Sequence, residues 1–305
     1  MPYFLGIDGG GTKTTCAVGD ESRLLATARA GPSNIVRVGE TQTRESLHRA
    51  VRQACGAAGI SANEIAGTCF GGSGAGRPDL AEIVRAILKE ILPTRVNVVG
   101  DMEIALEAAF DAGPGVIVIA GTGSIAYGRD QGGNALRAGG WGFAIGDEGS
   151  AYWIGREVVR AVLRESERQQ NNTELIDSVL VKGLFKVWGV NSFLDLARAA
   201  NSIPPPDFAA LFPAVVASGD DIARRILRDA GRELAGVAEV VILRLFSKNQ
   251  GVVPVAMTGG VFRHAELVRQ VFYNELRRLE ARVQVNPEVV DPVEGALRMA
   301  RRAGT

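Results

Sequence analysis

The sequence predicts an α/β protein of two half-molecules built on related plans, the second of which carries a helical insert. A Gly-rich turn follows a short apolar segment twice, once at residues 8–14 and again at residues 121–124. Around each turn the residues are typical of strands, and further along apolar residues recur at helical spacing, as in α/β lobes. With 305 residues, the chain is long enough for two lobes of roughly 100–200 residues each.

The first half begins with a hairpin rather than with a strand-helix unit. Tyr3 to Ile7, Thr14 to Val18 and Leu24 to Ala28 are short segments, and the first two are rich in β-branched or aromatic residues. The next predicted elements are a helix around 47–58, a strand at 68–70, a helix at 80–91, a strand at 96–99 and a helix at 104–110. We predict that residues 1–114, joined by the C-terminal helix 291–305, form the first lobe.

The second half repeats this order and interrupts it. Strands are predicted at 116–120, 125–128 and 135–137, and a mostly helical insert at about 149–246, with a loop at Pro204 to Pro206 and a long helix at 222–246. A strand at 252–257 and a helix from about 264 to 279 follow, and Asp291 begins a capped amphipathic helix that ends near Arg302. Residues 115–290 are the predicted second lobe.

The composition directs attention to local sites. The 34 Lys and Arg residues balance the 34 Asp and Glu residues, so no global charge attracts the chain to nucleic acid or to an anionic membrane. Cys16, Cys55 and Cys69 lack the short spacings of zinc, iron–sulfur or dithiol sites, which favours buried thiols. Neither a leader-like N-terminus nor an apolar run of about 18 residues is present, so we expect a cytoplasmic protein.

The first Gly-rich turn has the chemistry of a phosphate-binding loop. It lacks the spacing of a P-loop and lies between two strands. Its glycines let backbone N–H groups converge, and the Thr hydroxyls add donors. The predicted phosphate-binding residues are Gly10, Gly11, Thr12, Lys13 and Thr14; the alternative is an ordinary Gly-rich hairpin turn. Because a carboxylate beside a polyphosphate is repulsive without a cation, Asp8 predicts Mg²⁺, bound through water.

The second turn, formed by Gly121, Thr122, Gly123 and Ser124, offers the same donors at the end of an apolar strand. One such turn is weak evidence, since turns commonly contain Gly-x-Gly. Two of them at the starts of two similar half-molecules are a much stronger indication of a nucleotide site.

With these motifs the chain resembles the BadF/BadG/BcrA/BcrD-type branch of the sugar kinase, actin and heat-shock ATPase superfamily, a branch that includes N-acetylglucosamine kinase. Residues 6–14 and 119–124 look like its phosphate motifs, and 257–261, with Gly259 and Gly260, like its adenosine motif. Segments 99–101 and 291–296 are similar to its connecting segments. The resemblance implies a two-lobed actin-like (ribonuclease H-like) ATPase fold with duplicated βββαβαβα-type domains, ATP and Mg²⁺ as cofactors, and a homodimer.

Asp101 is the candidate catalytic base. It follows an apolar strand and therefore lies at the carboxyl end, where open α/β sheets bind ligands. Phosphoryl transfer to a hydroxyl needs a carboxylate that accepts the hydroxyl proton. As an alternative, Asp101 caps the helix that starts near Met102.

The stretch from Gly139 to Ala151, with the sequence GGWGFAIGDEGSA, is similar to the sugar-binding segment of the branch. Its glycines expose backbone donors, and Asp147 can accept from two sugar hydroxyls. The predicted substrate-binding residues are Asn34, Ser73, Asp101, Gly140, Trp141, Gly142 and Asp147. The alternatives are a helix-capping Asp147, a core-packed Trp141, a turn-forming Asn34, and a Ser73 that merely gives its loop mobility.

Together these features predict an ATP-dependent kinase that phosphorylates a hydroxyl of an amino sugar, N-acetylglucosamine first and glucosamine or glucose next. Two other functions share the resemblance: an ATPase activator of an acyl-CoA dehydratase or reductase, and a non-enzymatic ATP-binding actin-like or regulatory protein. The former needs cysteine ligands for an iron–sulfur cluster, and the latter has no evident use for residues 140–147.

Overall fold

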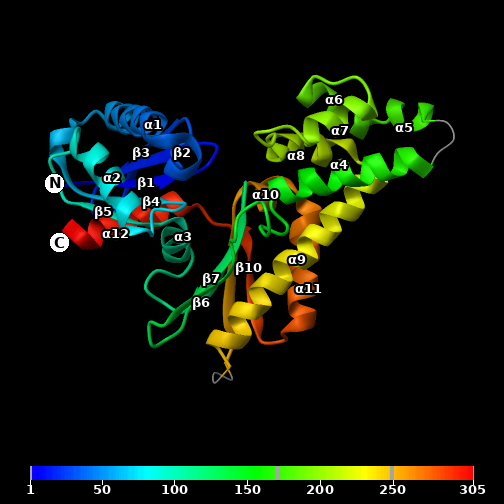
Figure 1. Ribbon diagram of the computed structural model, residues 1–305. Helices are drawn as coiled ribbons and strands as arrows, with labels where there is room; N and C mark the ends of the chain where they lie inside the picture. Colours follow the sequence, from blue (N-terminus) through cyan, green and yellow to red (C-terminus); the bar gives the residue numbers. More distant parts are fainter. Residues whose placement is uncertain (1, 169–171, 248–250, 305) are drawn as a thin grey trace. The chain divides into compact units, whose positions relative to one another are not determined.

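The computed structural model describes residues 2–168, 172–247 and 251–304 (Figure 1). The chain divides into two compact units. Unit 1 consists of Met1–Ile117 and Val290–Thr305, and unit 2 of Val118–Val289. The predicted lobe limits, residues 1–114 with 291–305 and residues 115–290, stay a prediction.

Unit 1 is built on a five-stranded mixed sheet in the order β3-β2-β1-β4-β5. Its strands are β1 (Tyr3–Gly9), β2 (Thr14–Gly19), β3 (Leu24–Ala30), β4 (Ile65–Gly72) and β5 (Val96–Gly100). β1 pairs antiparallel with β2 and parallel with β4, and β2 pairs antiparallel with β3. The first three strands therefore form the predicted meander, and the chain then returns through helices to add parallel strands on the other side of β1.

Helices cover both faces of this sheet, because alternate residues of β1 are apolar toward opposite sides. Leu5 and Ile7 lie in a core with residues of α1 (Ile35–Ala58) and α2 (Pro78–Lys89). Phe4 lies in a second core with residues of α3 (Asp101–Phe110) and of the C-terminal α12 (Pro292–Gly304). The 3-10 helix η1 (Ala62–Glu64) leads into β4.

Unit 2 repeats this plan around a second five-stranded sheet in the order β10-β9-β6-β7-β8. Its strands are β6 (Gly115–Ala120), β7 (Ser124–Arg129), β8 (Ala135–Gly139), β9 (Val253–Thr258) and β10 (Val283–Val289). Matched by their place in each half, the strands of the two sheets have the same order. The sequence prediction of a duplicated plan is confirmed.

The insert of unit 2 runs from α4 (Ala151–Arg168) to α9 (Asp221–Leu245) and is helical. Between them lie α5 (Thr173–Asp177), α6 (Val179–Trp188), α7 (Phe193–Ala200), the 3-10 helix η2 (Phe208–Leu211) and α8 (Phe212–Ser218). The ring of Phe208 packs against those of Trp188 and Tyr152, whose centroids lie 5.1 and 5.2 Å from its own, respectively. Among the described residues, no helix is both long and apolar enough to cross a membrane.

Some elements differ from the sequence prediction. Helix α1 begins at Ile35, whereas a helix was expected only around 47–58. Strand β10 was not expected, because Pro287 and polar residues interrupt its apolar pattern; it lies at a sheet edge, where a proline costs no ladder bond. The helix predicted from about 264 to 279 is α11 (Glu266–Leu279), and a short helix that was not predicted, α10 (Gly260–His264), precedes it. Ala265, with φ −112° and ψ 90°, separates them.

The close approach of α12 to α3 generates a stability prediction. A Cβ at Gly295 would overlap the carbonyl oxygen of Ile104, whereas a Cβ at Gly56, on the exposed side of α1, would have no heavy atom within 4 Å. Gly295→Ala should therefore lower the free energy of unfolding by about 1–3 kcal/mol. Gly56→Ala should raise it by up to about 1 kcal/mol, because alanine favours a helix. Urea unfolding of both variants tests this, and shifts of the same sign would contradict the packing.

Candidate active site

Three neighbouring strands of unit 1 end level with one another. The parallel register pairs Gly9 of β1 with Gly72 of β4, and Gly72 with Gly100 of β5. The buried ring of Phe70 lies so close to Gly9 and Gly72 that a Cβ on either would overlap it. The carboxyl ends of parallel strands form the ligand-binding edge of open α/β sheets. The loops that follow these three glycines therefore start at one edge.

Asp101, the first residue of α3, and Ser73, which directly follows β4, meet there. The Asp101 Oδ1 accepts a hydrogen bond from the Met102 N–H at 3.0 Å, and the Ser73 hydroxyl also donates to this carboxylate. Burial raises the pKa of the Asp101 carboxyl above its ordinary value of 3.8, and both hydrogen bonds oppose the rise. The structure thus brings two predicted site residues together around a carboxyl group with a perturbed pKa, which is typical of functional sites.

Asp101 is not the cap of α3. The N-cap residue is Gly100, and its N–H donates to the carboxylate of Glu103. Burial raises the pKa of Glu103 too, the Gly100 N–H lowers it, and the nearby Asp101 charge raises it further. Since Glu103 takes the capping role, the carboxylate of Asp101 is left for another function.

The first Gly-rich loop is fixed by backbone bonds. The Gly10 N–H donates to the Lys13 carbonyl at 3.0 Å, and the Gly10 carbonyl accepts from the N–H groups of Ser33 and Asn34 at 3.1 and 3.2 Å. Thr12 and Lys13 are exposed, and Gly11 is partly exposed. The loop therefore presents its tip to solvent on a rigid base, as a phosphate-binding turn requires.

Two predicted site residues of this region also have structural roles. The Thr14 side chain is fully buried, and its hydroxyl lies 2.7 Å from both the Gly31 carbonyl and the Ser33 hydroxyl. This geometry does not support a phosphate contact by the Thr14 hydroxyl, which anchors the loop instead. Asn34 is the N-cap of α1 and accepts from the N–H groups of Val36 and Arg37 at 3.1 and 3.3 Å. Its Oδ1 is thus occupied within the protein, as in the structural alternative.

Asp8 precedes the row of glycines and is the residue that would reach a metal ion. It pairs in register with Gly71 and is partly buried. Among the residues that the structure describes, no group of three or more His, Cys, Asp or Glu side chains could hold a metal ion. Mg²⁺ at phosphate sites takes few carboxylates and is held otherwise by phosphate oxygens and water. A single carboxylate at this strand end fits such an ion.

In unit 2, the carboxylate of Asp147 joins two loops. It accepts hydrogen bonds from the Ser124 N–H and from the Gly142 N–H, the latter at 3.2 Å. A Cβ at Gly123 would lie 2.7 Å from one oxygen of this carboxylate. Burial raises the pKa of Asp147, and these N–H groups oppose the rise. The Asp147 carboxylate therefore links loop 121–124 to the backbone of the predicted sugar-binding segment.

Asp147 does not cap α4. Ser150 caps this helix instead, because its hydroxyl oxygen accepts from the Trp153 N–H at 3.1 Å. The Ser124 hydroxyl donates to the Glu148 carbonyl at 2.7 Å, so this side chain has a partner within the protein. Asp147 itself has φ +60°, a conformation that residues other than glycine rarely adopt, and such strain is typical of functional positions.

Trp141 is exposed, so its alternative role in core packing is wrong. Its side chain is 68% exposed, and the Arg137 guanidinium lies over its ring, 5.1 Å from the centroid. Gly140 and Gly142, on either side, have φ +67° and +93°. Sequence reasoning did not single out Arg137, because the sequence does not reveal that an arginine of β8 lies over this indole.

The third Gly-rich turn packs against the second. Gly259 has φ +106°, and a Cβ there would overlap the carbonyl oxygen of Ala120, the last residue of β6. Only glycine fits, since both its conformation and its distance to the neighbouring strand exclude a side chain. The residues of the predicted adenosine motif thus lie next to those of the second phosphate motif.

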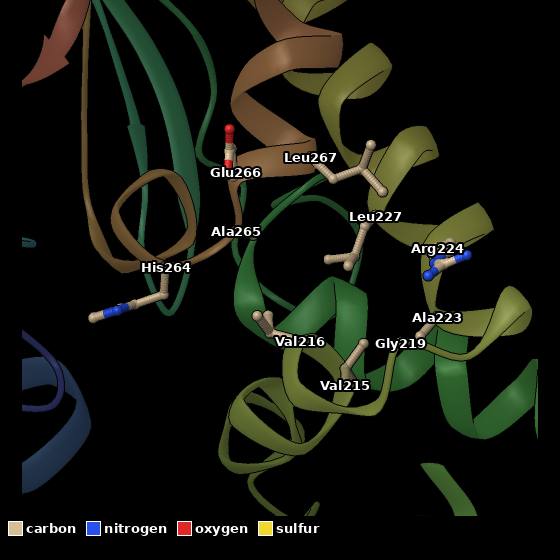
Figure 2. A pocket seen from close by; sticks show the side chains of 10 residues that line it. All are labelled: Val215, Val216, Gly219, Ala223, Arg224, Leu227, His264, Ala265, Glu266 and Leu267. Atoms are coloured by element: carbon tan, nitrogen blue, oxygen red, sulfur yellow. The ribbon is translucent and has the colours of Figure 1, made fainter. Parts of the chain in front are cut away.

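A pocket lies at the far end of α10, which begins at Gly260 (Figure 2). Its volume of about 270 Å³ is close to the lower end of the range, about 300–1,000 Å³, of small-molecule pockets. Val216, Leu227 and Leu267 lie between His264 and Arg224 in this view. The full lining is Val215, Val216, Gly219, Ala223, Arg224, Leu227, His264, Ala265, Glu266 and Leu267. It could not be predicted from the sequence, because its walls come from four separate helices, α8, α9, α10 and α11.

The three cysteines are buried in β2, α1 and β4, as the sequence predicts. Burial raises the pKa of the Cys69 thiol to about 12 and those of Cys16 and Cys55 above their ordinary value. Since the thiolate is the form that binds metals and clusters, these positions favour packing over ligation.

Known proteins are similar to this chain in sequence and fold over nearly its whole length. The model of the BadF/BadG/BcrA/BcrD ATPase family matches residues 5–300. The chain is 31% identical to the N-acetylmuramic acid/N-acetylglucosamine kinase of Clostridium acetobutylicum, over 99% of each chain. It is 27% identical to the N-acetyl-D-glucosamine kinase of Dictyostelium discoideum, over 97% of each. A solved structure of a proposed N-acetylglucosamine kinase from Chromobacterium violaceum matches with a TM-score of 0.76 and 26% identity, covering 97% of this chain and 98% of that one. The predicted actin-like ATPase fold is confirmed.

The raised pKa of Asp101 predicts how stability depends on pH. Below about pH 3.9 the carboxyl is protonated in the folded and unfolded chains, so its titration changes nothing. As the pH rises through the higher pKa of the folded state, the unfolded chain gives up this proton more readily, and the wild type loses stability. Asp101→Asn lacks that loss. Its free energy of unfolding, relative to the wild type, should therefore rise between pH 4 and pH 7.

Asp20→Asn is the matched control in unit 1. Hydrogen bonds from the backbone N–H groups of Arg23 and Ser22 lower the pKa of Asp20, so its removal should have the opposite pH trend. Urea unfolding at several pH values measures both variants. A difference between Asp101→Asn and the wild type that is constant with pH would contradict the raised pKa.

Proposed function

Because this chain belongs to the BadF/BadG/BcrA/BcrD ATPase family, we propose that it is an ATP-dependent kinase that phosphorylates a hydroxyl of an amino sugar. N-acetylglucosamine is the proposed acceptor, with glucosamine and glucose as alternatives. The relatives from C. acetobutylicum and D. discoideum are by name kinases of N-acetylated amino sugars, and the match to each spans nearly the whole chain. The observation that carries the proposal is the carboxyl group of Asp101, which has a raised pKa and is held by Ser73 at the sheet edge beside the first Gly-rich loop.

Asp101 is proposed as the general base. As the sugar oxygen forms a bond to the γ-phosphorus of ATP, its proton passes to the Asp101 carboxylate, the bond to the bridging oxygen breaks, and ADP leaves. A base is most effective when its pKa approaches the working pH, and burial moves that of Asp101 in this direction. Ser73 and the Met102 N–H orient the carboxylate. Mg²⁺, when bound, supplies charge neutralisation on the phosphates, with Asp8 as its proposed contact through water.

Unit 2 is proposed to bind the sugar through the segment 140–147. A carboxylate has about four acceptor positions, so the two N–H bonds of Asp147 leave capacity for two sugar hydroxyls. The backbone of Gly140 and Gly142 can approach a ligand closely, and the exposed Trp141 indole can cover a sugar face. Ser73 and the side-chain amide of Asn34 are the proposed contacts from unit 1.

The nucleotide is proposed to bind along the Gly-rich turns. The backbone of residues 10–14 and 121–124 would hold the phosphates, and Gly259 with Gly260 the ribose. The pocket at His264 to Leu267 then lies one short helix further along and suits the base, because its apolar walls can stack a purine ring while Glu266 can accept from an amine. The homodimer implied by the family resemblance stays a prediction.

The catalytic role of Asp101 is tested by Asp101→Asn, which keeps the size of the side chain and removes the base. We expect kcat for N-acetylglucosamine to fall by about 10²–10⁴-fold, while the Kd for the sugar changes little. The assay is ADP formation over a panel of hexoses and amino sugars, with Asp20→Asn as the control at a partly exposed carboxylate, which should keep wild-type kcat. A wild-type kcat in Asp101→Asn removes this role, and no activity with any sugar removes the proposed function.

The base pocket is tested by filling it. Val216 lines the pocket and is partly exposed, so an indole in its place can enter the pocket without disturbing a buried core. Val216→Trp should raise KM for ATP by about tenfold or more and leave the Kd for the sugar unchanged. Val187→Trp, at a 43% exposed position of α6 outside the pocket, is the control. Equal KM values for ATP in the two variants would mean that the base binds elsewhere.

A further inference from the structure

Arg137 on the edge strand β8 has a partner that leaves its hydrogen-bonding groups free. Its guanidinium lies over the Trp141 ring, with 5.1 Å from Cζ to the ring centroid. Within the part of the chain that the structure describes, its side chain has no hydrogen bond and no ion pair. Both Arg137 and the 68% exposed Trp141 are reachable by a ligand.

Stacking restricts a guanidinium without using its donors. The five N–H bonds of arginine point outward in the plane of the group, and the contact of Arg137 with the Trp141 ring is a cation–π contact that occupies none of them with an acceptor. Because the ring already limits the side chain, less conformational entropy is lost when an anion binds. The planar fork matches a carboxylate through two parallel hydrogen bonds. Arg137 is therefore prepared for a planar anion.

The position of Trp141 connects this cation with the proposed sugar site. The Gly142 N–H, directly after Trp141, donates to Asp147 at 3.2 Å, so the carboxylate of Asp147 is fixed beside the same stretch of backbone. Gly139 and Gly140, with φ +71° and +67°, turn the chain between Arg137 and Trp141. One short segment thus offers acceptors for hydroxyl groups at Asp147 and donors for an anion at Arg137.

We propose that Arg137 is a specificity-determining residue that binds a carboxylate substituent of the acceptor sugar. This rests on the proposed function, since it takes the ligand of residues 140–147 to be an amino sugar. The substrate class then includes acidic amino sugars, in which an ether-linked carboxylic acid extends from the ring, as well as neutral ones. Asp147 holds ring hydroxyls and contributes equally to both kinds, whereas Arg137 distinguishes them.

Calorimetric titration without ATP tests this inference with two probes, N-acetylmuramic acid and N-acetylglucosamine, which differ by a lactyl ether. Arg137→Gln should lower the affinity for the acidic sugar at least about tenfold more than for the neutral one. Arg137→Lys keeps the charge over the ring but loses the fork, and it should fall between. Arg164→Gln, at an exposed position of α4, is the control and should change neither Kd. Salt should weaken binding of the acidic sugar alone.

The inference is overturned if Arg137→Gln leaves the ratio of the Kd values for the two sugars unchanged. If the variant binds both sugars equally more weakly, Arg137 only supports Trp141. A wild type that binds the neutral sugar but not the acidic one also overturns the inference. A wild type that binds neither sugar overturns it together with the sugar site. The proposed function is judged separately, by incubation of both sugars with Mg·ATP. If they bind but no phosphate ester forms, the kinase proposal fails, and the Kd ratio still decides the role of Arg137.

Discussion

The candidate site of unit 1 depends on one packing constraint, the row of glycines that runs across the ends of β1, β4 and β5. Gly9, Gly72 and Gly100 share a register, and the ring of Phe70 occupies the space where side chains of the first two would lie. The strands consequently end at the same level. This brings the Ser73 hydroxyl to the Asp101 carboxylate and starts the first Gly-rich loop beside them.

In unit 2, a carboxylate rather than a row of glycines holds two loops together. Asp147 binds N–H groups of two loops at once, so the turn proposed for phosphates cannot move without the segment proposed for the sugar. Burial raises the pKa of both Asp101 and Asp147, and in both cases neighbouring donors oppose the rise. Each carboxylate is thus held in position by donors and retains acceptor capacity, which suits one for taking a proton and the other for binding hydroxyl groups.

The sequence predicted most of the fold, because its apolar periodicity and Gly-rich turns are local signals. Strand β10 was not predicted, because its proline is tolerated at a sheet edge but in the sequence is typical of the end of a strand. For the site, residue type and position were enough to name Asp101, Ser73 and Asp147 as candidates, whereas the direction of a side chain could not be predicted. Whether the Thr14 hydroxyl faces a ligand or Gly31, and whether Trp141 is buried, depends on tertiary contacts. The pocket proposed for the base is lined by segments that are far apart in the sequence, and the contact between Arg137 and Trp141 forms across a turn. Apolar periodicity predicts neither of them.

The central claim is that the γ-phosphoryl group goes to a sugar rather than to water. Phosphorus NMR of the protein with Mg·ATP and N-acetylglucosamine distinguishes the two products directly. The account predicts a sugar phosphate monoester signal that grows one for one with ADP. Formation of ADP with inorganic phosphate alone, for this sugar and for the other amino sugars and hexoses, would contradict it and would make the chain an ATPase of the same family.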